Sequence, residues 1–324
     1  MGTETKRDRF AKYAWFVLAF NLVVILWGVF LRASKSGDGC GQHWLTCRGE
    51  VIPSAPELKT IIEFSHRVTS SLAGILLIIL LGWAFWRWRS RNNKQNRLTV
   101  KAAFGAFIFV LIEGLLGAGL VLTGNTAENL TPERPLWMAG HLINTFILLM
   151  FLTLTARYAS AGRPIYFRVQ RKYLLAIALG ALAIFLVGIS GSIAALSSMI
   201  FPSGTIAEGI AKDFSPTSNV LLRLRLLHPI TAILTSVFLI FLTSWLAKER
   251  ANDKNLSRWS SVLSMLVLAQ IGFGSLTLLM LAPIILQLGH LLFADAIWIS
   301  YVLFAAGFLS SESLIAENNA EAGT

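Results

Sequence analysis

Residues 61–86, IIEFSHRVTSSLAGILLIILLGWAFW, form an apolar block that carries a histidine, His66, close to its start. A helix needs about 20 residues to cross about 30 Å of hydrocarbon, because each residue adds about 1.5 Å. A histidine inside such a helix is costly to keep there and usually has a function. The block therefore predicts a transmembrane helix with a functional side chain near one end.

Seven more blocks of this kind surround it along the chain. The eight predicted helices are residues 11–33, 61–86, 100–122, 136–158, 173–195, 220–246, 260–280 and 285–309. Of the 324 residues, 55% are hydrophobic and 14% are charged, whereas a soluble domain carries about 25% charged residues. Composition and blocks together predict an all-α integral membrane protein embedded in membrane lipid, and they argue against a soluble enzyme.

The basic residues predict the orientation of these helices. Eight crossings put both termini on the same side, and loops rich in Lys and Arg stay in the cytoplasm. Nineteen of the 28 basic residues lie in the tails and in the loops around 87–101, 157–172 and 247–259, against eight in the other loops. Both termini are therefore expected to be cytoplasmic. The net charge of +11 then serves topology and gives no reason to expect nucleic acid as a partner.

The second half of the chain repeats the pattern of the first. HRVTSSLAGILL at 66–77 is matched by HPITAILTSVFL at 228–239. The polar residues that follow in equivalent places are Glu113 and Gln270, then His141 and His290. Each half has four helices in the same orientation. The repeat therefore predicts two pseudo-symmetric four-helix bundles, residues 1–160 and 161–324, related by an axis along the membrane normal.

Four of the five histidines occupy equivalent places, near the outer ends of the even-numbered blocks: His66, His141, His228 and His290. A neutral imidazole is a good ligand for haem iron, and two histidines on two helices of one bundle can hold one haem. The alternative for any single histidine is a hydrogen bond to a neighbouring helix. Four histidines in repeated register favour haem, with one site in each half.

The two halves differ next to these histidines. Glu63 precedes His66 by three residues and so lies on the same helix face, whereas the equivalent residue of the second half is Arg225. A carboxylate at the edge of the bilayer suits proton transfer. The alternative is a structural ion pair with Arg67 or Lys59.

Arg225 and its neighbour Arg223 lie at the predicted outer interface of the second half. Guanidinium groups suit the propionates of a haem there, because they pair with carboxylates through two hydrogen bonds. The two arginines therefore predict a permanently held haem in the second half.

Two cysteines, Cys40 and Cys47, lie in the first outer loop, where an oxidising compartment would allow a disulfide. A disulfide there either tethers the loop or takes part in redox chemistry. A zinc site that also uses His43 is disfavoured, because it lacks a fourth ligand.

Two acids lie inside predicted helices. Glu113 belongs either to a proton path or to a hydrogen bond that packs two helices together. Asp295 is expected to have a buried partner, since an acid in this setting is costly alone.

Together these residues resemble the haem A synthases of aerobic bacteria and mitochondria over nearly the whole chain. The resemblance rests on Gly28-Val-Phe-Leu-Arg32 with the loop to Cys40 and Cys47, on Glu63-Phe-Ser-His66-Arg67, on His141 and His228, on GSIAALSSMIFPS at 191–203, and on Gly289-His290. The chain resembles the bacterial members that keep the cysteine pair in the outer loop. It departs from them at Leu45-Thr46, where a proline often precedes the second cysteine.

The resemblance implies an oxidoreductase that converts the C8 methyl of haem O to a formyl group and so makes haem A for terminal oxidases. Haem O would be the substrate, framed by His66 and His141, and Glu63 would take part in catalysis. His228 and His290 would ligate the iron of a resident haem b.

The resemblance also implies a setting for this reaction. The protein would lie in the inner membrane of a bacterial cell, with haem O synthase as a partner that supplies the substrate. The quinone pool or another acceptor would take the electrons. The oligomeric state, including a homo-oligomer, is left open.

Two other functions would use the same residues. A di-haem b-type cytochrome that takes electrons from quinol would hold both haems permanently, and it gives no purpose to Glu63 or to the cysteine loop. A transporter with two repeats would need broken helices near the midplane. The histidine-bearing blocks are continuous apart from Pro229.

Overall fold

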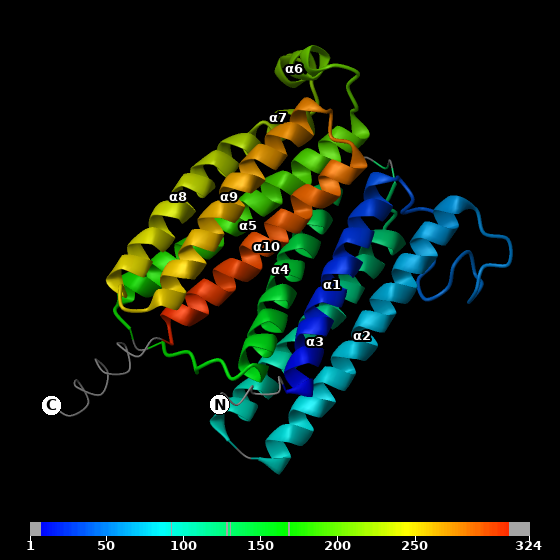
Figure 1. The fold of residues 1–324 in the computed structure, drawn as a ribbon. Helices are drawn as coiled ribbons and strands as arrows, with labels where there is room; N and C mark the ends of the chain where they lie inside the picture. The colour runs from blue at the N-terminus through cyan, green and yellow to red at the C-terminus, as the bar shows by residue number, and fades with distance from the viewer. Residues whose placement is uncertain (1–7, 92, 128, 130, 168, 311–324) are drawn as a thin grey trace.

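The computed structural model describes residues 8–91, 93–127, 129, 131–167 and 169–310. The helices, shown in Figure 1, are α1 (Arg9–Ala33), α2 (Leu58–Ser90), α3 (Lys94–Leu122), α4 (Arg134–Ala159), α5 (Arg171–Ile200), α6 (Ile206–Phe214), α7 (Val220–Arg225), α8 (Leu227–Glu249), α9 (Lys254–Leu279) and α10 (Ile284–Phe308). The described residues contain eight spans long and apolar enough to cross a membrane, and α7 and α8 together form one of them. The prediction of an all-α protein with eight transmembrane helices is confirmed, and the described residues contain no strand.

Three of the long helices begin at side chains that cap them. Asp8, Asn93 and Asp253 each accept a hydrogen bond from a backbone N–H in the first turn of α1, α3 and α9. Such a cap satisfies a donor that has no partner inside the helix. These caps explain why α3 and α9 begin several residues before the predicted apolar blocks.

The helices pack as two groups of four (Figure 1). In the first half α1 contacts α2, α2 contacts α3, α3 contacts α4, and α4 returns to α1. In the second half the same order of contacts runs through α5, α8, α9 and α10. The division of the chain between residues 160 and 161 and the pseudo-symmetry of the two groups stay predictions. The terminal segments used for the predicted orientation, residues 1–7 and 311–324, lie outside the described residues.

An aromatic cluster joins the two halves. The Trp298 ring of α10 stacks on Phe146 of α4, with ring centroids 5.6 Å apart, and meets Phe185 of α5 edge-on at 5.2 Å. The indole N–H of Trp298 donates to the backbone oxygen of Phe146 at 2.6 Å. No water is available inside a bilayer to satisfy this donor, so the bond fixes how the halves meet.

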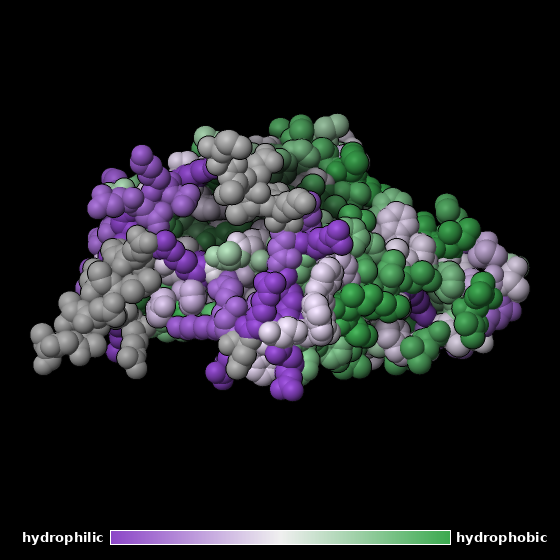
Figure 2. All heavy atoms as spheres, turned by 60° about the horizontal axis from the view of Figure 1, so that its bottom comes forward, coloured by the Kyte–Doolittle hydropathy of each residue, from purple (hydrophilic) through white to green (hydrophobic). Residues whose placement is uncertain are grey.

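The outer surface suits a membrane. Large apolar side chains such as Phe16, Ile78 and Phe241 are exposed along the flanks of the helices. Figure 2 shows hydrophilic residues gathered at the end where α2 meets α3 and α8 meets α9, while hydrophobic residues cover much of the side. The opposite end carries the segment 34–57 and α6 (Figure 1). We call it the loop end.

Helix packing inside the second half depends on a missing side chain at Gly180 of α5. A Cβ there would collide with the hydroxyl of Tyr301 and would lie 2.7 Å from Cδ2 of Leu242. We expect Gly180→Ala to lower the free energy of unfolding by about 1–3 kcal/mol, because overpacking forces the helices apart. Thermal unfolding of the detergent-solubilised protein, followed by tryptophan fluorescence, measures this.

Gly74→Ala in α2 is the matched control. No atom lies within 4 Å of the position of the added Cβ, so its unfolding midpoint should equal or exceed that of the unmodified protein. Equal midpoints for the two variants would contradict the packing argument.

Candidate functional site

The cysteine pair forms a disulfide at the loop end. Cys40 and Cys47 are bonded, with their Cα atoms 4.4 Å apart, and no free cysteine occurs in the described residues. The predicted disulfide is confirmed. Because both sulfurs are bonded to each other, they cannot serve with His43 as thiolate ligands of zinc.

Glu63 lies at the loop end of α2 and is only 3% exposed. Its Oε2 accepts a hydrogen bond from the Cys40 N–H at 2.8 Å, and its Oε1 pairs with Nη2 of Arg67 at 2.5 Å. The ion pair considered as an alternative is thus present with Arg67. Lys59 instead lies 3.6 Å from Asp38. Glu63 connects the disulfide loop directly to the helix that carries His66.

Arg67 holds the other side of the loop. Its Nη1 donates to the backbone oxygens of His43 and Thr46, each at 2.8 Å, and its guanidinium lies 6.0 Å from the centre of the Trp44 ring. One arginine therefore ties the loop to α2 and neutralises Glu63 at the same time.

His66 of α2 and His141 of α4 are the two transmembrane histidines of the first half. The two rings lie close enough to interact electrostatically, and Nδ1 of each is buried without a hydrogen-bond partner. Nδ1 of His141 is 3.5 Å from Oε1 of Glu113. That carboxylate accepts hydrogen bonds from Thr145, at 2.5 Å, and from Asn144. Glu113 therefore packs α3 against α4, and its carboxylate lies next to Nδ1 of His141.

His228 and His290 form the second pair. Their ring centroids are 6.1 Å apart and their planes are perpendicular. A metal–nitrogen bond is about 2 Å long, so this spacing leaves room for one metal ion between the rings. The Ser190 hydroxyl lies 3.2 Å from Nδ1 of His228, and Gln270 Nε2 lies 3.3 Å from Nε2 of His290. Gln270 thus stands by the last histidine of its half, as Glu113 does in the other.

Three glycines make space for these imidazoles. A Cβ on Gly28, Gly191 or Gly274 would lie 3.0, 2.9 or 2.8 Å from the Cε1 atom of His66, His228 or His290, respectively. The sequence analysis did not name the glycines as site residues. A glycine on the helix preceding each histidine helix is the signal that identifies them.

The two arginines of the second half bond to the protein itself. Arg225 pairs with Asp213 of α6 at 2.6 Å and donates to the backbone oxygen of Gly209, while Arg223 donates to that of Pro216 at 2.6 Å. They attach α6 to α7, and their role at haem propionates stays a prediction. The sequence analysis missed α6, although Thr205 followed by Glu208 is a helix-start signal.

Asp295 contradicts one expectation. It is fully buried in α10, and neither carboxylate oxygen has a hydrogen-bond partner in the described part of the chain. The predicted buried partner is not found there.

The donor set fits haem better than a free metal ion. Nowhere among the described residues do three or more His, Cys, Asp or Glu side chains gather to hold an ion. The histidines come in pairs, and a porphyrin needs only axial ligands because its own nitrogens supply the rest. Buried Nδ1 atoms without a hydrogen-bond partner on His66, His141 and His290 agree with this.

The contacts by which Arg67 holds the disulfide loop can be tested without any cofactor. We expect Arg67→Ala to speed hydrogen–deuterium exchange across residues 40–47, because removing one partner of a buried ion pair costs about 3–5 kcal/mol. Lys59→Ala is the control, since its pair with Asp38 is exposed and such pairs contribute about 0–1 kcal/mol. Equal exchange in both variants would show that Arg67 does not hold the loop.

Comparison with known proteins gives a family. The model for cytochrome oxidase assembly proteins, COX15-CtaA, matches residues 11–302. A haem A synthase from Alkalihalophilus pseudofirmus is 30% identical over 250 residues, which is 76% of this chain and 79% of the relative. Another from Shouchella clausii is 29% identical over 262 residues, 78% of this chain and 81% of the relative.

A second kind of relative is matched only in part. A protohaem IX farnesyltransferase from Thermus thermophilus is 40% identical over 305 residues, which is 93% of this chain but 49% of the relative. The chain thus spans about half the length of that protein. The family model and the haem A synthases agree over most of the chain, which therefore belongs to the COX15-CtaA family of cytochrome oxidase assembly proteins, together with the haem A synthases.

Proposed function

We propose that this protein is a haem A synthase, an oxidoreductase that converts the C8 methyl of haem O to a formyl group. The observation that carries the proposal is Glu63, a buried carboxylate one turn from His66 that has no equivalent in the second half. Two identical electron carriers would have no use for this difference.

The two halves would divide the work. Haem O, the substrate, would sit between His66 and His141 in residues 1–160. A resident haem b would be held by His228 and His290 in residues 161–324. The 6.1 Å spacing of the second pair and the glycines beside the rings support these assignments. Haem b, when bound, supplies one-electron transfer.

The reaction releases protons beside the substrate. Adding oxygen from water to the methyl group gives an alcohol and releases two electrons and two protons. A second round gives a geminal diol, which loses water to leave the formyl group. The electrons would pass to the quinone pool or another acceptor, and the protons need a nearby base.

Glu63 is placed to be that base. Cys40 N–H and Arg67 each bond to one of its oxygens, and each carboxylate oxygen has lone pairs for a further hydrogen bond. Pairing with Arg67 favours the ionised form of the carboxylate, which is the form that accepts a proton. The disulfide loop above it excludes bulk water and holds the carboxylate oriented.

Farnesyl transfer is not proposed for this chain. The relative named for it is matched over 49% of its length, whereas the haem A synthases are matched over about four fifths of theirs. That relative supports a different point, because it carries a segment similar to this chain within a protein named for making a farnesylated haem. We propose that haem O synthase is the partner that delivers the substrate, in a bacterial inner membrane with the disulfide loop facing outward and both termini cytoplasmic.

Glu63→Gln tests the catalytic assignment. In cells that make haem O but no haem A, the unmodified protein should yield haem A on extraction and chromatography. The variant should yield at least about a hundredfold less, because a positioned base contributes about 10²–10⁴ in rate. Its haem b content should not change.

Glu57→Gln is the control, since its carboxylate is 72% exposed at the start of α2. It should make haem A at the normal rate. If no version of the protein makes haem A and all hold only haem b, the electron-carrying cytochrome replaces the synthase.

Histidine variants test the division between the halves. His228→Ala and His290→Ala should each lose the resident haem b, whereas His66→Ala should keep it, because the two pairs lie in separate bundles. The pyridine haemochrome of the purified protein measures the haem b per chain. Equal losses from all three variants would indicate two equivalent permanent haems.

A further inference from the structure

Two arginines converge at the loop end of the first half. Arg32 lies in the last turn of α1 and Arg134 is the first residue of α4, and these two helices pack together. Both residues therefore lie at the loop end of two helices that pack against each other.

Neither arginine has a carboxylate at ion-pair distance within the described ranges of the chain. Arg134 is 3% exposed, and its Nη1 donates to the backbone oxygen of Asn129 at 2.7 Å while its Nε is buried without a partner. Arg32 is partly buried. Burying two like charges without a counterion costs free energy. An anion from outside the chain would therefore stabilise this pair of arginines.

The pair lies directly outward of the proposed substrate site. Arg32 follows Gly28, which faces the His66 ring, by four residues, and therefore lies on the same face of α1 about 6 Å nearer the loop end. Arg134 precedes His141 by seven residues, which is two turns and about 10 Å along α4 in the same direction. Both guanidinium groups are therefore placed to meet one edge of a ring held between the histidines.

The second half shows the contrast. There the arginines nearest the histidine pair, Arg223 and Arg225, already bond to Pro216 and Asp213. Only in the first half does the described chain leave two clustered arginines without an acid.

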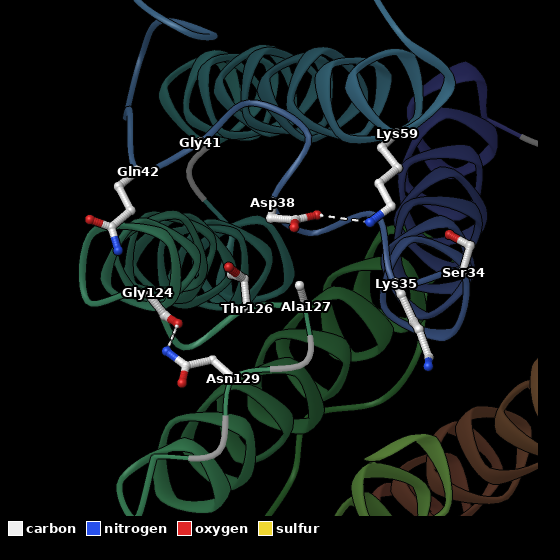
Figure 3. Close-up of a pocket in the computed structure, with 10 residues that line it drawn as sticks. All are labelled: Ser34, Lys35, Asp38, Gly41, Gln42, Lys59, Gly124, Thr126, Ala127 and Asn129. Atoms are coloured by element: carbon white, nitrogen blue, oxygen red, sulfur yellow. Dashed lines mark hydrogen bonds and ion pairs between the residues drawn. The ribbon is translucent and has the colours of Figure 1, made fainter. Parts of the chain in front are cut away.

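A cavity of about 500 Å³ opens at the loop end of the first half (Figure 3). Ser34, two residues after Arg32, lines one side, and Asn129, which accepts the hydrogen bond from Arg134, lines another. In the figure the Lys59 amine points toward Asp38, and Lys35 extends away from that pair. One residue close in sequence to Arg32 and one residue bonded to Arg134 therefore line the same cavity.

We propose that Arg32 and Arg134 bind the two carboxylates that haem carries on one edge, its propionates. The inference rests on the proposed function, which puts a haem between His66 and His141. The arginines set how deep the ring enters the first half and which way its edge turns toward Glu63. Guanidinium groups suit this task because each donates two parallel hydrogen bonds to a carboxylate.

The test measures binding rather than turnover. Full-length protein that keeps its resident haem is placed in phosphatidylcholine nanodiscs and titrated with ferric protohaem or with its dimethyl ester, which lacks both carboxylates. Soret difference absorbance gives the two dissociation constants. The unmodified protein should prefer the free acid. Arg32→Gln and Arg134→Gln should each reduce that preference by about tenfold, as expected for a lost hydrogen bond to a charged group.

Matched variants distinguish the effect of losing the positive charge from the effect of losing the folded structure. Arg32→Lys and Arg134→Lys keep the charge and should keep part of the preference. Lys212→Gln removes an exposed charge from α6 and should change nothing. The Soret band of the resident haem reports whether each variant is folded.

Several results would overturn the inference. One is an equal loss of affinity for both probes in the glutamine variants, which would give the arginines a structural role only. Another is an unchanged preference for the free acid. A third is a lack of preference in the unmodified protein together with arginine-dependent binding of phosphatidylglycerol, which would assign the site to a lipid headgroup.

The variant His66→Ala distinguishes an error in the proposed propionate site from an error in the proposed function. If His66→Ala abolishes binding of added haem while the arginine variants have no effect, only the propionate site is wrong. If His66→Ala changes the binding of neither probe, no haem sits at His66 and the proposed function fails as well.

Discussion

A bilayer core offers no water to a polar group, so each donor and acceptor inside it must find a partner in the protein. The chain meets this constraint with helices and with bonds such as that from the Trp298 indole to the Phe146 oxygen, which joins the two halves. Polar atoms that lack a partner under this constraint are informative. Nδ1 of His66, Nδ1 of His290 and Nε of Arg134 are such atoms, because each is buried without a hydrogen-bond partner in the described part of the chain.

The two halves share a scaffold but differ in what surrounds each histidine pair. In the second half Arg225 is neutralised by Asp213, and the short helix α6 closes over the loop end. In the first half Glu63 and Arg67 neutralise each other and hold the disulfide loop instead. The two bundles thus differ in the charges that lie near their histidine pairs and in the segment that those charges hold.

Much of the fold and the histidine pairs could be predicted from the sequence, since they depend on local patterns. Hydrophobic blocks of membrane length predicted each of the eight spans but not the short helix α6, and the repeat of His66 with His228 predicted two pairs of histidines. The ion pair of Glu63 with Arg67 was weighed as an alternative because the two residues are four apart on one helix face. The lack of a partner for Asp295 was not predictable, because it depends on which side chains surround α10 after folding.

The sequence alone determined the membrane class, the eight spans, the paired histidines and the cysteines, because hydrophobicity and spacing act over a few residues. Only the tertiary structure decided which distant groups meet. Cys40 N–H reaches Glu63, glycines on neighbouring helices make room for three of the imidazoles, and the packing of α1 against α4 brings Arg32 and Arg134 to the same end. Contacts between residues far apart in the sequence depend on the angles at which the helices cross. Those angles are set by the packing of many side chains together rather than by any short stretch of the chain.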